Sequence, residues 1–155
     1  MIYISSATED DMSGILEIER ESISPPWTHG ALLGEIFRDD SFFAVARRHG
    51  LHSAVADSII GFIILRRVAD EGELFQIAVD KDSRRRGVAD MLMDAAFSYA
   101  SAKALLTLYL EVRKSNEAAI QLYKKCGFHP MRQRKNYYDS PVEDAVVMVR
   151  YLHAK

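Results

Sequence analysis

A run of three arginines and a glycine is the segment of this sequence best suited to bind an anion. Apolar residues recur at helical spacing directly after it, and a helix that starts behind a short loop aims several free backbone N–H groups at one point. Such a point binds phosphate. The segment consists of Arg84, Arg85, Arg86, Gly87, Val88 and Ala89. It has neither the Gly-Lys-Ser/Thr of a triphosphate loop nor the several glycines of a dinucleotide fingerprint. A solvated charged surface is the alternative interpretation.

Glu111 is a second candidate, because it is a carboxylate inside an apolar strand pattern. Residues 105–112 alternate, with Leu106, Leu108, Leu110 and Val112 on one face and Glu111 on the other. A buried carboxylate without a partner costs free energy. Periodicity alone favours an ion pair with Arg113 on the same face, and it leaves a catalytic base as the alternative.

Three residues farther along the chain share one helical face. Asn116, Ala119 and Tyr123 are three and four residues apart, and the small Ala119 leaves room for a ligand between two polar ends. A single helical tyrosine is more often part of a core. The pattern therefore indicates either a groove wall or core packing.

Composition places few demands on partners. The 155 residues are 48% hydrophobic and carry a formal net charge of -2, which gives no reason to expect direct nucleic-acid or anionic-membrane binding. The N-terminus lacks the pattern of a signal peptide, and the most apolar run, residues 59–65, is too short to cross a bilayer. With a single cysteine, these features favour the cytoplasm. They do not indicate an oligomeric state.

No metal site is expected. The five histidines, His29, His49, His52, His129 and His153, have no ligand spacing, and surface roles are the simplest interpretation. The single cysteine, Cys126, lies at the expected C-terminus of a helix, where the helix dipole disfavours a thiolate. We interpret it as a packing residue rather than a nucleophile.

The elements that must position these residues follow from periodicity and capping signals. Strands are expected at 2–6, 41–47, 59–68, 73–80, 105–112, 128–134 and 142–150, and helices at 8–21, 28–38, 88–99 and 115–126. Thr8 with Asp11 has the spacing of a capping box, Thr28 and Ser115 are candidate caps, and Gly127 is a stop signal. The order predicts one mixed α/β (α+β) domain over residues 1–155.

The order and spacing of four segments resemble the GNAT acetyltransferases. The segments are Gln76-Ile77-Ala78-Val79-Asp80, the run from Arg84 to Ala89, Leu110-Glu111-Val112-Arg113-Lys114-Ser115-Asn116, and Ala118-Ala119-Ile120-Gln121-Leu122-Tyr123. Further stretches are similar to the branch of the family that acetylates the N-terminal alanine of a small-subunit ribosomal protein. They are Pro26-Trp27-Thr28, Lys124-Lys125-Cys126-Gly127-Phe128, Arg134-Lys135-Asn136-Tyr137-Tyr138 and Glu143-Asp144-Ala145.

The resemblance implies the GNAT fold, a mixed, largely antiparallel, twisted sheet with helices on both faces, splayed near residues 73–80. It implies acetyl-CoA as the cosubstrate, held at its pyrophosphate by the backbone N–H groups of residues 85–89, with Arg84 opening the family pattern. The backbone of Ile77, Ala78 and Val79 would bind the pantetheine arm and stabilise the carbonyl oxygen as it becomes anionic.

The resemblance also assigns chemical roles. Glu111 becomes the base, acting through water, and Tyr123 the acid that protonates the departing thiolate. Asn116 contacts the pantetheine amides, with Ala119 beside it. The amine attacks the thioester directly, so no covalent enzyme intermediate is needed.

The acceptor expected from the resemblance is a protein N-terminal amine, most simply the alanine of a ribosomal protein. Trp27, Tyr137 and Tyr138 would wall the peptide groove, with loop packing as the other interpretation. An α-amino group is about a tenth neutral at pH 7, against a few hundredths of a percent for lysine. Two alternatives stay open. One is a GNAT enzyme acting on lysine or a small polyamine, and the other is an RNA-associated module in which tyrosines beside Arg134 and Lys135 stack on bases.

Overall fold

Seven strands form one sheet in the order β1-β2-β3-β4-β5-β7-β6. The computed structural model describes residues 1–52 and 54–152. The strands are β1 (Ile2–Ser6), β2 (Ser41–Arg48), β3 (Ser58–Val68), β4 (Glu71–Val79), β5 (Thr107–Arg113), β6 (His129–Asp139) and β7 (Val142–Tyr151). Every neighbouring pair is antiparallel except β4 and β5, which are parallel. The expected mixed, largely antiparallel sheet is confirmed.

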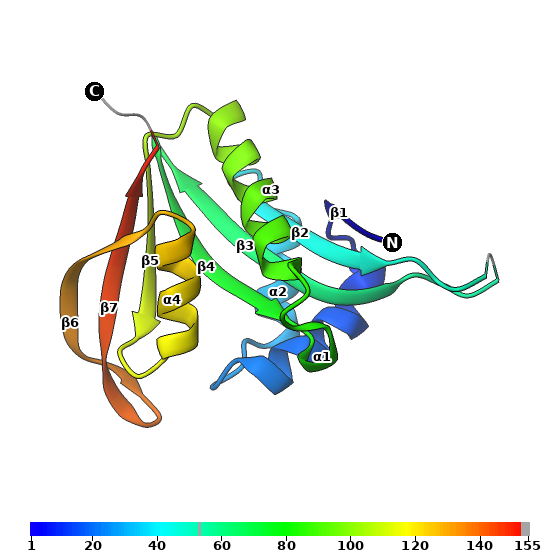
Figure 1. Ribbon diagram of the computed structural model, residues 1–155, viewed down its shortest axis with the longest axis horizontal. Coiled ribbons are helices and arrows are strands. Elements are labelled where there is room, and N and C mark those ends of the chain that lie inside the picture. Colours follow the sequence, from blue (N-terminus) through cyan, green and yellow to red (C-terminus); the bar gives the residue numbers. More distant parts are fainter. Residues whose placement is uncertain (53, 153–155) are drawn as a thin grey trace.

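Helices cover both faces of this sheet (Figure 1). On one face lie α3 (Val88–Ala102) and α4 (Glu117–Lys125), and on the other lie α1 (Met12–Ser22) and α2 (His29–Ile36). Two short 3-10 turns, Glu9–Asp11 and Lys81–Ser83, precede α1 and α3. The central strands therefore have two buried faces over much of their length.

The capping signals are mostly used as expected. The Asp11 carboxylate accepts from the Thr8 backbone N–H at 2.8 Å, although the box opens a 3-10 turn and α1 itself begins at Met12. Thr28 accepts from the N–H of Ala31 at 3.1 Å at the start of α2.

The cap assigned to Ser115 is wrong, because Asn116 holds that position. The Asn116 side chain accepts from the N–H of Ala119 at 3.2 Å. The backbone N–H of Ser115 instead donates to Glu143 on β7 at 2.6 Å, so the helix starts one residue later.

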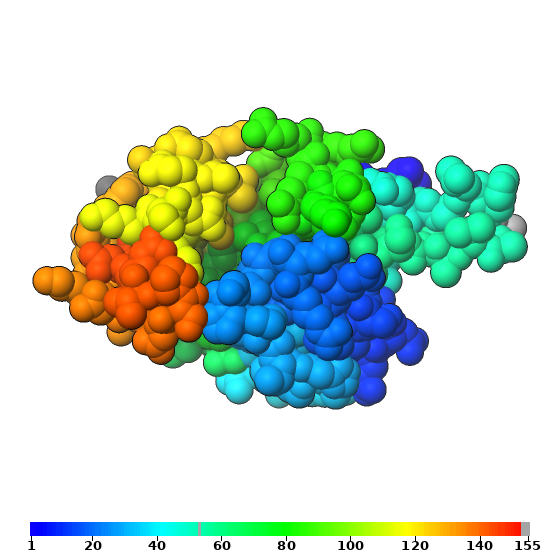
Figure 2. Space-filling model, turned by 90° about the horizontal axis from the view of Figure 1, so that it is seen from below, coloured from blue at the N-terminus to red at the C-terminus, as the bar shows by residue number. Residues whose placement is uncertain are grey.

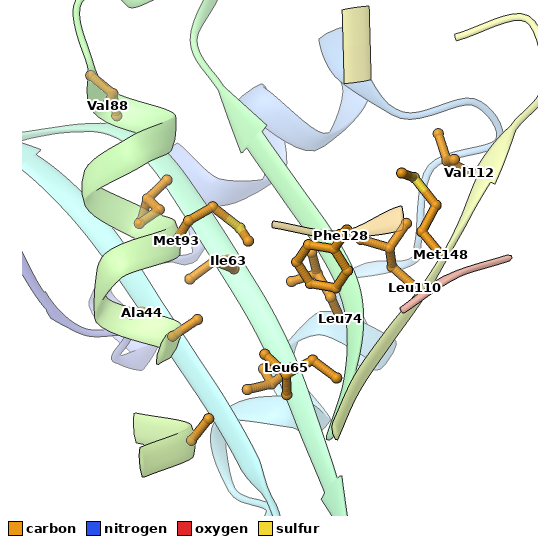
Figure 3. Close-up of a cluster of buried hydrophobic side chains, with 14 of the residues drawn as sticks. Ala44, Ile63, Leu65, Leu74, Val88, Met93, Leu110, Val112, Phe128 and Met148 are labelled. Carbon is orange, nitrogen blue, oxygen red and sulfur yellow. The ribbon is translucent and has the colours of Figure 1, made fainter. Parts of the chain in front are cut away.

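Two buried clusters fill the space between the sheet and its helices. The cluster under α3 and α4 includes Ile63, Leu74, Leu110, Phe128 and Met148 (Figure 3). The cluster under α1 and α2 includes Ile15 and Ile18, which lie three residues apart on one face of α1, with Phe62 and Ile64 of β3. Consecutive residues of β3 thus point into different clusters, as expected of a central strand.

The strand boundaries differ from the expectation around β5. Leu105 and Leu108 are both fully buried although they are three residues apart, so strict alternation begins only at Thr107. Leu106 is 39% exposed and is not on the buried face. The turn before Leu106 explains why the alternation of buried and exposed side chains starts late, because Ala104 has a left-handed backbone with φ 55°.

The parallel pair β4–β5 is short because β4 contains a bulge. Ile64 and Leu65 of β3 pair with Gln76 and Leu74, so Phe75 is an extra residue. Only Glu71–Leu74 of β4 pairs with β5, through Thr107–Leu110. Beyond that point the two strands separate toward their C-terminal ends, as Figure 1 shows. The expected splay is confirmed.

We predict that Leu108→Ala lowers the free energy of unfolding by about 2–5 kcal/mol, since it leaves a cavity in the cluster under α3 and α4. Leu106→Ala removes the same atoms from a side chain that is 39% exposed, and it should cost less than about 1 kcal/mol. Urea unfolding of both variants measures the difference. Equal losses would contradict the assignment of Leu106 to the surface.

Candidate active site

The arginine–glycine loop forms the entrance to α3. Gly87 is the N-cap with a left-handed backbone, φ 81°, and apart from its immediate chain neighbours no atom lies within 4 Å of the point that a Cβ would occupy. Arg85, with φ 61°, is also left-handed. Among the described residues, no hydrogen bond uses the backbone N–H of Arg85, Arg86 or Gly87. The first N–H groups of α3 have no partner within the helix. The loop therefore offers several free donors around open space.

The six residues of the loop have different surroundings. The guanidinium of Arg84 donates to the carbonyl oxygen of Val79 at 3.1 Å, so its Nε ties the loop to the end of β4. Arg85 and Arg86 are exposed, Val88 is buried against the sheet, and Ala89 is half-buried. Arg84 is exposed too, but its Nε is already bonded to Val79, so the backbone N–H groups and the guanidinium groups of the loop are what an anion can reach.

The C-terminal half of β4 presents an unpaired backbone edge. Ile77 and Val79 pack into the cluster under α3 and α4, and Ala78 packs into the opposite one. Their backbone is paired to β3 on one side, while the β5 side has no ladder partner beyond Leu74. The side chains are thus structural, and the backbone groups on the β5 side remain available.

A groove leads to this edge from the loop. Seen from the end at which the strands separate, the surface is hollowed between α4 in yellow and the start of α3 in green (Figure 2). Ala119 and Tyr123 of α4 are only half-buried, and Asn116 is exposed. The oxygen of the Asn116 side chain is used by the helix cap, which leaves its amide nitrogen as the free group.

Glu111 projects from β5 on the face opposite α3 and α4, and its partner is Arg134. Oε1 accepts from the Arg134 guanidinium at 2.9 Å, while Oε2 is buried without a hydrogen-bond partner among the described residues. The pair with Arg113 that periodicity favoured is wrong. Arg113 forms its ion pair with Glu143 of β7, at 3.4 Å. Only the sheet order β5-β7-β6 brings Arg134 within reach of Glu111.

Arg113 links the end of β5 to two loops. Its guanidinium donates to the carbonyl oxygens of Ser140 at 3.2 Å and Pro141 at 3.0 Å, in the turn between β6 and β7. It also reaches the carbonyl oxygen of Ser24 at 3.5 Å, in the segment between α1 and α2. Figure 2 shows these two segments, orange-red and blue, side by side. No pattern along the chain pointed to this role.

Two tyrosines lie at the same end of β5. Burial raises the pKa of Tyr123 well above the ordinary phenol range, and the nearby Tyr138 phenol raises it further. Burial, followed by the charge of Glu111, raises the pKa of Tyr138 to about 12. Both phenols therefore keep their protons at neutral pH. The arrangement brings Glu111, Tyr138 and Tyr123 to one end of the strand.

Arginine guanidinium groups stack on Tyr137 and Tyr138, the two tyrosines that we expected to line the peptide groove. The Arg113 guanidinium lies 4.3 Å from the centre of the Tyr138 ring, and that of Arg134 lies 4.4 Å from the centre of the Tyr137 ring. Tyr137 is 44% exposed, and the proximity of its phenol to the Glu111 carboxylate is the main cause that raises its pKa. One face of each ring is already occupied, which leaves at most the other face for a stacked ligand.

A buried polar contact fixes the elbow that carries Trp27. The fully buried Glu19 of α1 accepts from the backbone N–H of Trp27 at 2.8 Å and from the Gln76 side chain at 3.1 Å. Burial raises the pKa of Glu19. The Trp27 ring meets Phe75 edge-on at 5.9 Å. Glu19 is four residues from Ile15, so helical spacing puts it on the core face of α1, and this is the sequence signal for a buried carboxylate here.

A pocket of about 450 Å³ opens beside Glu111 on the α1 and α2 side of the sheet. Its walls include Glu73 of β4 with Arg132 and Arg134 of β6. Burial and the neighbouring charge of Glu111 raise the pKa of Glu73. Glu73 was not among the expected site residues, because only the parallel pairing of β4 and β5 brings it near Glu111.

The remaining expectations concern metals, the cysteine and membranes. Within residues 1–52 and 54–152, His, Cys, Asp and Glu side chains form no group able to hold a metal ion, and His153 lies outside this range. Cys126 packs against the cluster under α3 and α4, and burial raises the pKa of its thiol. No helix in the described part of the chain is long and apolar enough to cross a membrane.

Comparison with known proteins supports what this geometry suggests. A relative from Haemophilus ducreyi, named [ribosomal protein bS18]-alanine N-acetyltransferase, is 36% identical over 96% of this chain and 99% of its own. The crystal structure of the ribosomal-protein-S18-alanine N-acetyltransferase from Escherichia coli is 30% identical, with a TM-score of 0.87 over 100% of this chain and 96% of that one. Arabidopsis thaliana NAA60 in complex with acetyl-CoA shares the fold, with a TM-score of 0.89 at 19% identity over 97% of this chain and 99% of that one.

The family model described as "Acetyltransferase (GNAT) family" matches residues 12–128, which run from the start of α1 to the residue before β6. This range contains the bulged strand, the arginine–glycine loop and Glu111. The chain therefore belongs to the GNAT family of acetyltransferases.

Proposed function

We propose that this chain transfers the acetyl group of acetyl-CoA to the α-amino group of a protein N-terminus, with the N-terminal alanine of a ribosomal protein as the acceptor. The observation that carries the proposal is the position of Glu111. It follows Leu110, the last residue of β5 that pairs with β4, and it lies on the face of the sheet opposite α3 and α4. Relatives with 36% and 35% identity carry that activity in their names. Such an acceptor would place the reaction in the cytoplasm.

The free donors at the start of α3 fit the pyrophosphate of acetyl-CoA. The open space around Gly87 lets an anion approach the backbone, and the N-terminal end of the helix favours negative charge. The exposed Arg85 and Arg86 add positive charge. The unpaired edge of Ile77, Ala78 and Val79 can hydrogen-bond an extended chain of amides as a neighbouring strand would, which suits the pantetheine arm.

The chemistry requires a neutral amine and a protonated leaving group. Glu111 takes a proton from the acceptor ammonium through a water molecule, and the amine lone pair then attacks the thioester carbonyl carbon. A β4 backbone N–H stabilises the oxyanion. The tetrahedral intermediate then collapses: the C–S bond breaks, Tyr123 gives its proton to the thiolate, and the attached nitrogen loses its extra proton to water, from which the Tyr123 phenolate recovers its own. The raised pKa of Tyr123 keeps the phenol protonated until that step.

The acceptor approaches on the face that carries Glu111. Trp27 on its elbow and Tyr138 at the β6–β7 turn stand on two sides of this end of β5, and Arg113 contacts both segments. Tyr137 lies next to Tyr138, with the ring centres 5.0 Å apart. An α-amine suits this arrangement because it needs less basic help than lysine to become neutral at pH 7.

The acceptor is tested with peptides that begin with alanine and contain one internal lysine. We expect mass spectrometric fragmentation to place the added acetyl group on the α-nitrogen, because that amine is about a tenth neutral at pH 7. The control peptide has a blocked N-terminus and the same lysine, and it should remain unmodified. Acetylation mainly on lysine in both peptides would overturn the acceptor proposal and favour a lysine or polyamine acetyltransferase.

Glu111→Gln and Tyr123→Phe should each lower the single-turnover rate by about 10²- to 10⁴-fold, since each removes one proton-transfer group. Calorimetry should give wild-type affinity for acetyl-CoA in both variants. If both variants keep the wild-type rate when the chemical step limits turnover, the two side chains are structural and the assignment of base and acid fails.

Gly87→Ala should weaken acetyl-CoA binding about tenfold, because a left-handed alanine is strained by roughly 1–2 kcal/mol and its methyl group enters the anion's approach. The matched control is Gly34→Ala in α2, where the space is also open and φ is not positive. Arg85→Ala should lose less than Gly87→Ala. Calorimetry with acetyl-CoA and with NAD decides the outcome, and equal affinity for the two ligands would contradict the loop assignment.

A further inference from the structure

We propose that Arg134 is a positioning residue for the base: it holds Oε1 of Glu111 and so leaves Oε2 as the oxygen that takes the acceptor's proton. The inference rests on the proposed role of Glu111. It goes further by assigning separate roles to the two carboxylate oxygens and by adding a residue from another strand.

The contact itself has the geometry of a strong, charge-assisted hydrogen bond. The Arg134 guanidinium and Glu111 Oε1 are 2.9 Å apart, and the Glu111 side chain is only 18% exposed. The Arg134 guanidinium is 43% exposed, so the carboxylate is the shielded partner and water screens the pair mainly from the arginine side. The short contact to a shielded carboxylate restrains its orientation more than a pair with two exposed partners would.

Arg134 is itself held in place before it reaches Glu111. Its guanidinium lies over the ring of Tyr137 at 4.4 Å, and such stacking suits a planar cation. In the sheet, Arg134 pairs with Ala145 of β7, and Ala145 pairs with Arg113 of β5. The side chain thus crosses β7 diagonally, past a residue with only a methyl group, to reach Glu111.

The second oxygen of Glu111, Oε2, has different surroundings. Oε2 is buried and has no hydrogen-bond partner among the described residues. A buried carboxylate oxygen without a donor is unfavourable, so it gains most from a donor that the acceptor brings, either a water molecule or the ammonium. With Oε1 occupied, a proton transferred to the carboxylate goes to Oε2.

The same end of β5 carries a second set of three residues of the same types: an arginine that stacks on a tyrosine and pairs with a glutamate. Arg113 lies over Tyr138 and pairs with Glu143, as Arg134 lies over Tyr137 and pairs with Glu111. The two sets differ in how the carboxylate is used. Glu143 accepts from the Ser115 N–H and from Arg113, so both of its oxygens have partners. Within residues 1–52 and 54–152, the Glu111 carboxylate therefore keeps one oxygen without a partner and the Glu143 carboxylate keeps none.

The test is a double-mutant cycle on Glu111 and Arg134, measured on the acceptor amine that the wild-type chain turns over fastest. Arg134→Ala should lower kcat by about 10- to 100-fold, because the base loses its orientation, with the KM for acetyl-CoA unchanged. Arg134→Lys should recover part of the loss. The double variant Glu111→Gln with Arg134→Ala should be no slower than Glu111→Gln alone, because Arg134 acts through the carboxylate.

Added guanidinium ion separates positioning of the base from a purely structural role, because it can replace the missing side chain next to Glu111 but cannot repair a misfolded variant. It should raise the kcat of Arg134→Ala and leave Glu111→Gln unchanged. Arg38→Ala is the matched control, since its pair with Asp40 has a similar distance of 2.8 Å and Arg38 is 45% exposed against 43% for Arg134. That control should keep the wild-type kcat.

Three outcomes would overturn the proposal. They are wild-type or higher kcat in Arg134→Ala, independent losses that multiply in the double variant, and a loss confined to the KM of the acceptor. Transfer to lysine rather than an α-amine would refute the acceptor proposal alone, because the cycle is measured on whichever amine reacts. Wild-type rate in Glu111→Gln would refute the base and this inference together.

Discussion

The separation of β4 from β5 is the constraint on which the rest of the site depends. Phe75 is an extra residue in β4, and it changes which side chains face which cluster: Leu74 and Ile77 both pack toward α3 and α4. Without the bulge, strict alternation would send one of them to the other face. Because pairing to β5 ends at Leu74, the backbone edge and the groove between α3 and α4 become available for an extended ligand.

Arginines stabilise the open end that this separation creates. A strand that loses its neighbour also loses hydrogen bonds and side-chain packing, and β5 replaces them with contacts from loops. Arg113 contacts carbonyl oxygens in the α1–α2 segment and the β6–β7 turn, and Arg134 contacts Glu111 from β6. The planar guanidinium suits both tasks, since it can stack on a tyrosine while it donates several hydrogen bonds.

Buried carboxylates give the site its electrostatic character. Glu19 is fully buried and orders the Trp27 elbow, and burial raises its pKa because it disfavours the charged form. Glu73 and Glu111 lie close enough for the charge of Glu111 to raise the pKa of Glu73. Negative charge near the acceptor site attracts an ammonium group, which is the protonated form of an α-amine, a lysine side chain and a polyamine alike.

The sequence by itself determined the order of the elements, most of their ends and the loop before α3. Each of these depends on neighbours along the chain: helical periodicity, the capping box at Thr8 and the glycine with positive φ at position 87. The resemblance to GNAT enzymes then supplied the candidate roles of Glu111 and Tyr123. Local patterns gave the wrong position for two residues. Leu106 is exposed because a turn precedes it, and Ser115 is not the helix cap because its N–H bonds to Glu143 of β7.

Only the tertiary structure decided the partners of the charged residues. Glu111 and Arg113 are two residues apart on one face of a strand, yet each pairs with a residue from another strand. Arg134 is 23 positions from Glu111 along the chain and reaches it because β7 lies between β5 and β6. Glu73 meets Glu111 through the one parallel pairing in the sheet. Ion-pair partners depend on distance in space and on burial, and neither follows from spacing along the sequence once several strands with charged residues share a sheet.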